Sequence, residues 1–160
     1  MKYLAIAAAL LAALGTAAQA ATGMSQMQYY VGSWSCMAGN VGQKPSKATV
    51  TYTMDNGILH GTVLVPVQAG MKHQYSLSQD TIYDAKSNQF IMSSLDNTAA
   101  WSISTAKPWT GNTESWTDRA NSGKLSHNIT VRHSQTSFSF EGYPTTTSTK
   151  ANFAGSCTKS

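Results

Sequence analysis

The sequence predicts an all-β protein, an antiparallel meander of about eight to ten short strands closed into a barrel. From Tyr29 onward, apolar and polar residues alternate with a period of two, which is typical of half-buried strands. Clusters of Gly, Asn, Asp, Ser and Pro separate these segments and favour tight turns. Two cysteines, Cys36 and Cys157, stand near the two ends of the alternating region, where a disulfide would join the first strand to the last. A two-sheet β-sandwich is the alternative fold.

The first twenty residues have the three parts of a cleavable signal peptide. Lys2 gives a positive start, Leu4 to Leu14 form a short apolar run, and Ala18-Gln19-Ala20 matches the small-x-small cleavage rule. The run is shorter than the roughly 20 residues that a membrane span needs, so a retained anchor is the less favoured alternative. We therefore expect a signal peptide over 1–20, one domain over 21–160, a periplasmic or secreted location, and no membrane span after cleavage.

Charge and motifs argue against several classes of function. The chain has 11 Lys and Arg against 7 Asp and Glu, without a basic run, so no nucleic-acid partner is expected. The sequence contains no Gly-x-Ser-x-Gly, His-Glu-x-x-His, Cys-x-x-Cys or phosphate-binding glycine loop. The sequence therefore favours a protein that is not an enzyme, and it assigns no catalytic residue and no metal site.

The clearest local prediction is a hairpin around Asn56-Gly57. In residues 47–54, Ala48, Val50, Tyr52 and Met54 alternate with Lys47 and three threonines. Asn-Gly is the strongest short hairpin signal, because both residues tolerate positive φ. With these two residues in the loop, Met54 pairs with Leu59, Tyr52 with Gly61 and Val50 with Val63. Both strands then present their apolar residues on the same face.

Seven further segments have the same short alternating pattern between turn signals. They are His73 to Tyr83, Gln89 to Leu95, Ala99 to Ser104, Thr113 to Thr117, Lys124 to His133, Thr136 to Gly142, and Lys150 to Thr158. No sustained helical periodicity occurs after residue 20, although Met24 to Tyr30 could form a turn of helix.

The positions of the cysteines favour closure of the sheet. An even pair in an oxidising compartment predicts a Cys36–Cys157 disulfide, which would close a loop of about 120 residues. The loop-entropy model gives such a crosslink about 4–5 kcal/mol. Trp34 and Cys36 share one face of the first strand, and Phe153 and Cys157 share one face of the last. A closed barrel also removes the exposed edges that an open sheet has to protect.

Gly32-Ser33-Trp34 places a Gly-x-Trp motif at the start of the first strand. This motif, with the strand number and chain length, resembles the lipocalin-like (calycin) barrels, including the nitrobindin-like branch and small exported bacterial proteins of unassigned function. The resemblance implies that Trp34 plugs one end of the barrel and that Gly32 lets the chain bend beneath it. It also makes Arg132 the candidate for a late-strand arginine packed on the tryptophan, although Arg132 alternates out of phase with Ile129 and Val131.

We expect such a barrel to bind a small apolar or amphipathic molecule without transforming it. The alternation predicts that the interior is lined by Val50, Tyr52, Leu59, Val63, Tyr75, Leu77, Ile129, Val131, Phe138 and Phe140. A structural or protein-interaction module with a filled core is the alternative from another class. No cofactor is required for either hypothesis.

Histidines carry the remaining alternative, a nitrobindin-like haem protein. His73, His127 and His133 share the parity of apolar neighbours, so each could point inward as a haem or metal ligand, whereas His60 should face solvent. His127 and His133 lie six residues apart on one strand, about 20 Å, and cannot share a metal. A histidine at a strand end, hydrogen-bonded or hydrated, is the simpler interpretation.

Glu114 with Asp118 or Glu141 is the only acid/base couple that the sequence suggests.

Overall fold

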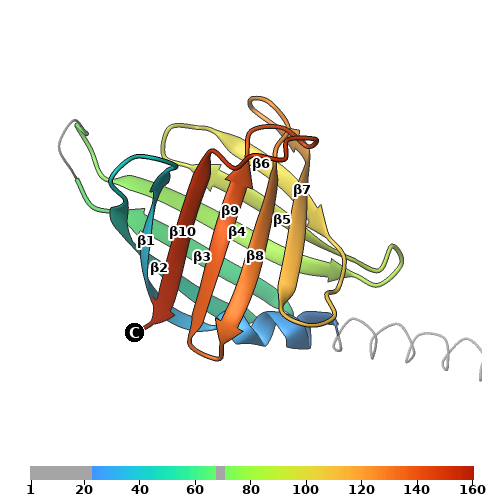
Figure 1. Ribbon diagram of the computed structural model, residues 1–160. Helices are drawn as coiled ribbons and strands as arrows, with labels where there is room; N and C mark the ends of the chain where they lie inside the picture. Colours follow the sequence, from blue (N-terminus) through green and yellow to red (C-terminus); the bar gives the residue numbers. More distant parts are fainter. Residues whose placement is uncertain (1–22, 68–70) are drawn as a thin grey trace, which may run out of the picture.

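The computed structural model describes residues 23–67 and 71–160, and the predicted signal peptide lies outside the described residues. Ten antiparallel strands form one closed barrel (Figure 1), in which every strand pairs with its sequence neighbours and β1 pairs with β10. The barrel prediction is therefore confirmed and the sandwich alternative is wrong. The strands are β1 (Gly32–Asn40), β2 (Ser46–Asp55), β3 (Ile58–Val65), β4 (Tyr75–Asp84), β5 (Gln89–Asp96), β6 (Trp101–Ala106), β7 (Thr113–Asn121), β8 (His127–Ser134), β9 (Ser137–Tyr143) and β10 (Phe153–Lys159).

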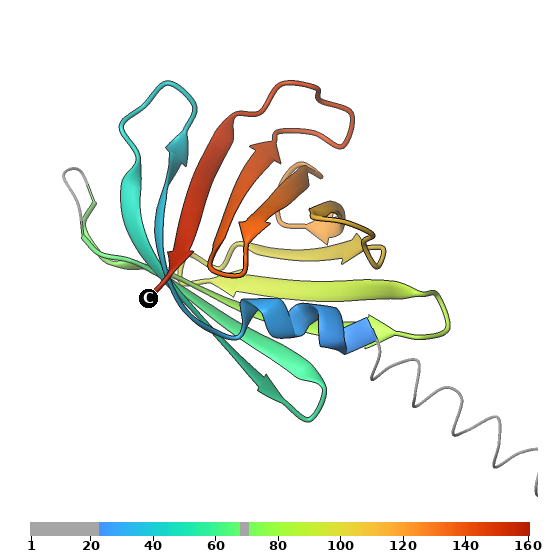
Figure 2. The same ribbon diagram turned by 60° about the horizontal axis from the view of Figure 1, so that its bottom comes forward.

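A short helix covers one end of the barrel, as Figure 2 shows. Residues 23–27 are helical and continue into η1 (Gln28–Tyr30), which leads directly into β1. Met24, Met27 and Tyr30 are buried, which indicates that the helix is packed through its apolar residues. We call this the helix end, and the opposite end, where β1 leads into β2 and β9 into β10, the loop end. None of the described helical residues forms a segment long and apolar enough to cross a bilayer.

The β2–β3 hairpin has the predicted register. Met54 pairs with Leu59, Tyr52 with Gly61 and Val50 with Val63. Asn56 and Gly57 have φ values of 47° and 78°, the left-handed conformation that this two-residue turn requires. The Asn-Gly turn and the apolar alternation predicted the same register, and the structure confirms it.

Several strands begin later than the alternation predicts, among them β6 and β8, where side chains hold the preceding turn. Before β6, the Asp96 carboxylate accepts a hydrogen bond from the Ala100 backbone N–H at 3.0 Å. Ala99 has a φ of 67° and stands in the turn before β6 instead of in the strand. Before β8, the Asn121 amide donates to the Lys124 carbonyl at 2.8 Å, which holds residues 122–126 out of the sheet. These short polar side chains compete with the strand ladder for backbone groups.

Strands β1 and β10 close the barrel, and the predicted disulfide lies between them. Cys36 and Cys157 are direct partners in the ladder and their sulfur atoms are bonded at 2.02 Å. Gly32, where the chain turns from η1 into β1, has a φ of 122°, a conformation that L side chains rarely adopt. The Cys36–Cys157 disulfide thus joins the first strand of the barrel to the last.

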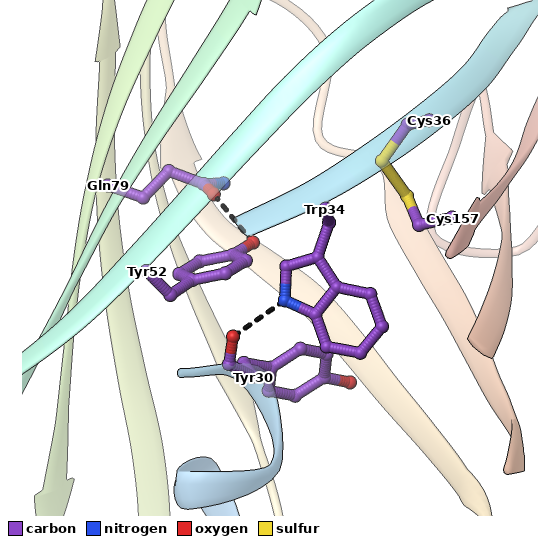
Figure 3. Close-up of a disulfide and its surroundings, with 6 residues drawn as sticks. All are labelled: Tyr30, Trp34, Cys36, Tyr52, Gln79 and Cys157. Carbon is purple, nitrogen blue, oxygen red and sulfur yellow. Dashed lines mark hydrogen bonds between the residues drawn. A yellow bond between two sulfur atoms is a disulfide. The ribbon is translucent and has the colours of Figure 1, made fainter. Parts of the chain in front are cut away.

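Trp34 lies fully buried just above the helix end. Its indole N–H donates to the Tyr30 carbonyl at 2.7 Å (Figure 3), and its ring packs edge-on against Phe138 at 4.9 Å between centroids. The Lys159 ammonium lies 5.1 Å from the centre of the Trp34 ring, in the place where the resemblance implied Arg132. Arg132 instead lies over Tyr29 and Trp109, at 5.3 and 4.8 Å from the ring centres.

Candidate functional site

The barrel encloses a cavity of about 380 Å³. This volume falls within the usual range of small-molecule sites, and a ten-strand barrel is wider than an eight-strand barrel, whose side chains can fill it. Eight of the ten residues predicted to face inward line the cavity: Val50, Tyr52, Leu59, Val63, Tyr75, Leu77, Phe138 and Phe140. The alternation of the sequence thus placed most of the wall.

The prediction for β8 was wrong. Asn128 and Thr130 line the cavity, so Ile129 and Val131 lie on the outer face of the strand, where they are half-buried. The register explains the difference, because Thr130 pairs with both Glu114 and Phe140, whose side chains point inward. Arg132 has the same parity as Thr130, and its position against a buried carboxylate and two aromatic rings decides the phase of β8.

Two glycines let aromatic rings lie flat along the wall instead of filling the space. A Cβ atom at Gly61 would lie 2.5 Å from the Tyr52 ring, and one at Gly155 would lie 2.5 Å from the Phe140 ring. Any larger residue at either position would push the ring into the cavity. The open interior therefore depends on the absence of a side chain at Gly61 and Gly155.

Glu114 is the most unusual residue of the wall, because a carboxyl group is seldom so deeply buried. Its exposed fraction is 2%, and its two oxygens accept hydrogen bonds from the Tyr30 hydroxyl and, at 3.2 Å, from the Trp116 indole N–H. Burial raises the pKa of Glu114, and the hydrogen bonds from Tyr30 and Trp116 and the nearby Arg132 only partly oppose this rise. The same burial and the adjacent Glu114 raise the pKa of Tyr30.

Arg132 is the counter-ion of Glu114. Its Nε atom lies 4.0 Å from a Glu114 oxygen and, although buried, has no hydrogen-bond partner among the described residues. A terminal nitrogen of the guanidinium donates to the Gly111 carbonyl at 2.6 Å, which ties the 107–112 loop to the helix end. Trp109, in that loop, is buried against Phe90 at 5.2 Å and therefore folds onto the barrel.

A second polar pair stands across β2 and β4. The Tyr52 hydroxyl donates to the Gln79 side-chain oxygen at 3.3 Å (Figure 3). Among the residues that the structure describes, the amide nitrogen of Gln79 finds only the Met92 sulfur, at 3.6 Å, as an acceptor. Burial raises the pKa of Tyr52 to about 12, with a smaller contribution from Glu114, so this hydroxyl is protonated at neutral pH.

The histidines lie away from the cavity lining. His127 stacks on Tyr143 with ring centres 4.3 Å apart, and its Nδ1 atom lies 2.9 Å from the Thr145 carbonyl. His133 is exposed and bonded to the Ser139 hydroxyl at 2.8 Å, and His73 is exposed before β4. None of the described residues that line the cavity is a histidine, so the alternative in which these three point inward has no support, and their positions agree with the simpler interpretation of hydrogen-bonded or hydrated histidines. His127 and His133 stand outside because β8 turns the opposite set of residues toward the cavity. His73 stands outside because β4 begins only at Tyr75.

The acidic residues do not form the couple that the sequence suggested. Glu114 and Asp118 both point inward, but four residues separate them on one strand, about 13 Å. Asp118 accepts hydrogen bonds from the hydroxyls of Ser104 and Ser126, both at 2.7 Å, and so holds the β7–β8 turn. Glu141 is exposed and accepts from Tyr143. Within residues 23–67 and 71–160, no group of three or more His, Cys, Asp or Glu side chains is arranged to hold a metal ion.

Sequence reasoning missed several polar residues of the wall: Gln79, Thr81, Asn128, Thr130 and Glu114, which it considered only as half of an acid/base couple. One signal was available for Glu114. It lies two residues from Trp116 and therefore on the same face of the strand, and tryptophan side chains are highly buried on average. For Asn128 and Thr130 no such signal existed, because their neighbours Ile129 and Val131 are the more apolar set.

Comparison with known proteins supports the architecture alone. No protein-family model matches the chain, and no curated protein matches it. Among solved structures, Rv2717c from M. tuberculosis is similar with a TM-score of 0.61 and 14% identity, over 86% of this chain and 97% of that one. A redesigned β-barrel has a TM-score of 0.49 and 12% identity, over 83% of this chain and 93% of that one. At this level of identity, the similarity to Rv2717c shows that the chain has the fold of a known antiparallel β-barrel.

Proposed function

We propose that this protein is an exported, lipocalin-like carrier that binds one small apolar or amphipathic molecule inside the barrel without transforming it. The single observation that supports this most directly is the cavity of about 380 Å³ within a closed barrel. Its wall is mostly aliphatic and aromatic, with a few polar groups at defined places, which is the usual composition of a ligand site.

The other features are consistent with a carrier. The disulfide agrees with an oxidising location, as expected for a protein exported by the predicted signal peptide. Glu114 and Asp118 each accept hydrogen bonds from side chains of the protein and lie about 13 Å apart along β7. The haem alternative has less support, because the three candidate histidines stand outside the cavity.

Binding can be tested with the apolar dye N-phenyl-1-naphthylamine, whose fluorescence rises when it leaves water. Val63 lines the cavity on β3, and its neighbour Leu64 is 38% exposed on the outer face, so the two positions form a matched pair. We expect the wild type and Leu64→Trp to bind the dye saturably at one site, and Val63→Trp to lose at least tenfold in affinity. Circular dichroism would verify that both variants fold, and Leu77→Trp provides a second way to fill the cavity. No saturable binding to the wild type, or equal loss in both variants, would refute the proposal.

A further inference from the structure

Three polar side chains stand together on one part of the cavity wall. Glu114 pairs with Thr130 across β7 and β8, and Trp116, two residues along, pairs with Asn128. Glu114, Asn128 and Thr130 all line the cavity, so their side chains lie side by side on the inner face. We call these three residues the polar wall.

The polar wall has unused hydrogen-bonding capacity. Among the described residues, neither the Asn128 amide nor the Thr130 hydroxyl has a hydrogen-bond partner, and both face the cavity. The Glu114 oxygens accept two hydrogen bonds, although a carboxylate has about four acceptor positions. Asn128 and Thr130 can each donate and accept, so the wall as a whole offers both donors and acceptors to whatever occupies the cavity. Asn128 and Thr130 are half-buried and their polar atoms are not among the buried atoms without a partner, so a ligand would replace water at these groups and has to offer hydrogen bonds in return.

The charge on this wall is already balanced. Arg132 lies 4.0 Å from the Glu114 carboxyl group, and the side-chain exposure of the two residues is 18% and 1%. Among the described residues, the cavity lining includes no Lys, Arg or Asp, so a cationic or anionic ligand would find no further charge of opposite sign on this part of the wall. Burying an ion without its own counter-ion is unfavourable, whereas a neutral polar group loses little if its hydrogen bonds are replaced.

Apart from the Tyr52–Gln79 pair, Thr81 and the Tyr75 hydroxyl, most of the rest of the lining is apolar. Val63 and Val65 on β3 and Leu77 on β4 contribute aliphatic side chains to the cavity. A ligand that fills this space needs a hydrocarbon part as well as a polar group. An amphipathic molecule would match both the polar wall and the aliphatic part of the cavity.

Building on the proposed carrier function, we propose that the ligand has an uncharged head group that both donates and accepts hydrogen bonds, such as a primary amide or a hydroxyl. This head group bonds to Glu114, Asn128 and Thr130, and the hydrocarbon part lies among the aliphatic residues of β3 and β4. Free ammonium and carboxylate head groups are excluded by the balanced charge.

Four eight-carbon compounds that differ only in the head group test this assignment. Octanamide, 1-octanol, octylammonium and octanoate would each displace N-phenyl-1-naphthylamine from the full-length protein at pH 7, where the last two are ionised. We expect the two neutral compounds to bind at least about tenfold more tightly than both ions, the difference made by one well-formed hydrogen bond or by one uncompensated charge. Equal affinities for all four, or tighter binding of either ion, would overturn the inference.

Isosteric variants locate the head group. Thr130→Val and Asn128→Leu remove the hydrogen-bonding atoms with little change of shape, and Thr62→Val makes the same change on the exposed face of β3. Each wall variant should lower the affinity for octanamide relative to that for the dye about fivefold or more, and Thr62→Val should leave this ratio unchanged. An unchanged ratio in both wall variants would place the head group elsewhere. Absence of dye binding by the wild type refutes the carrier function and this inference together, whereas dye binding without discrimination among head groups refutes the inference alone.

Discussion

At the scale of single residues, Glu114 and Arg132 form a buried ion pair between the packed helix end and the cavity. Neither charge is favourable alone in this environment, and each compensates for the burial of the other. The pair also explains the phase of β8, because Arg132 reaches Glu114 only if it points inward, and Asn128 and Thr130 then follow it. The alternation of apolar residues separates the two faces of a strand, but it does not show which face points inward when one of them carries a buried ion pair. The inward face of β8 could therefore not be predicted from the sequence.

The pKa of Glu114 makes a prediction about stability. Burial raises this pKa above the ordinary value of 4.5, so between 4.5 and the raised value the folded chain binds more protons than the unfolded chain. The free energy of unfolding should therefore fall as the pH rises through that interval, and Glu114→Gln should remove this contribution. Urea denaturation from pH 4 to pH 8 measures the difference between the two proteins.

Glu141→Gln is the matched control for this measurement, because Glu141 lies exposed on β9. It should follow the wild type in its dependence on pH. If Glu114→Gln also runs parallel to the wild type over the whole range, Glu114 does not titrate with a raised pKa and the description of its environment is wrong.

At the scale of elements, the β2–β3 hairpin and the β8 strand mark the limits of prediction from the sequence. The hairpin was predicted to the residue, because Asn56-Gly57 specifies the turn and the alternation on both sides specifies the register. On β8, the alternation favours Ile129 and Val131 as the inner face, whereas pairing with β7 and β9 turns Asn128 and Thr130 inward. The start of β6 and β8 depends on side chains that bond turn backbone, which no periodicity reveals.

The hairpin turn itself can be tested at Gly57. Its φ of 78° is left-handed and a Cβ atom there would meet nothing within 4 Å, so replacement by alanine adds backbone strain without a clash. Gly57→Ala should therefore destabilise the protein by about 1–2 kcal/mol in chemical denaturation. Gly123→Ala serves as control, since Gly123 is equally open but has no positive φ, and its effect should be much smaller. Equal effects at the two positions would show that strain in the turn is not the cause.

At the scale of the whole molecule, closure of the sheet could be predicted because two independent signals coincided. The strands alternate throughout the chain, and the cysteines stand on the first and last strands, where they become direct partners. What the sequence did not reveal is how the interior is divided between packed side chains, such as Trp34 and Phe90, and a cavity that reaches from Met27 at the helix end to Val65 and Tyr75. That division depends on the sizes of side chains that meet only in the folded protein, including the space left by Gly61 and Gly155.

The disulfide should contribute strongly to stability, because it joins residues 121 positions apart. The loop-entropy model gives about 5 kcal/mol for a loop of this length. The double variant Cys36→Ala/Cys157→Ala should therefore unfold at a clearly lower temperature than the oxidised wild type. Dithiothreitol serves as the second comparison: it should lower the midpoint of the wild type once the bond is reduced and leave that of the double variant unchanged. Equal midpoints for the oxidised wild type and the double variant would contradict a closing role for the bond.

Native mass spectrometry of the non-reduced protein, exported by a bacterial host, shows directly whether the cavity holds a molecule. We expect a native mass that exceeds the denatured mass by one small molecule in the wild type and in Leu64→Trp, and no such excess in Val63→Trp. The same native spectrum for all three proteins, whether each carries extra mass or none does, would contradict this expectation.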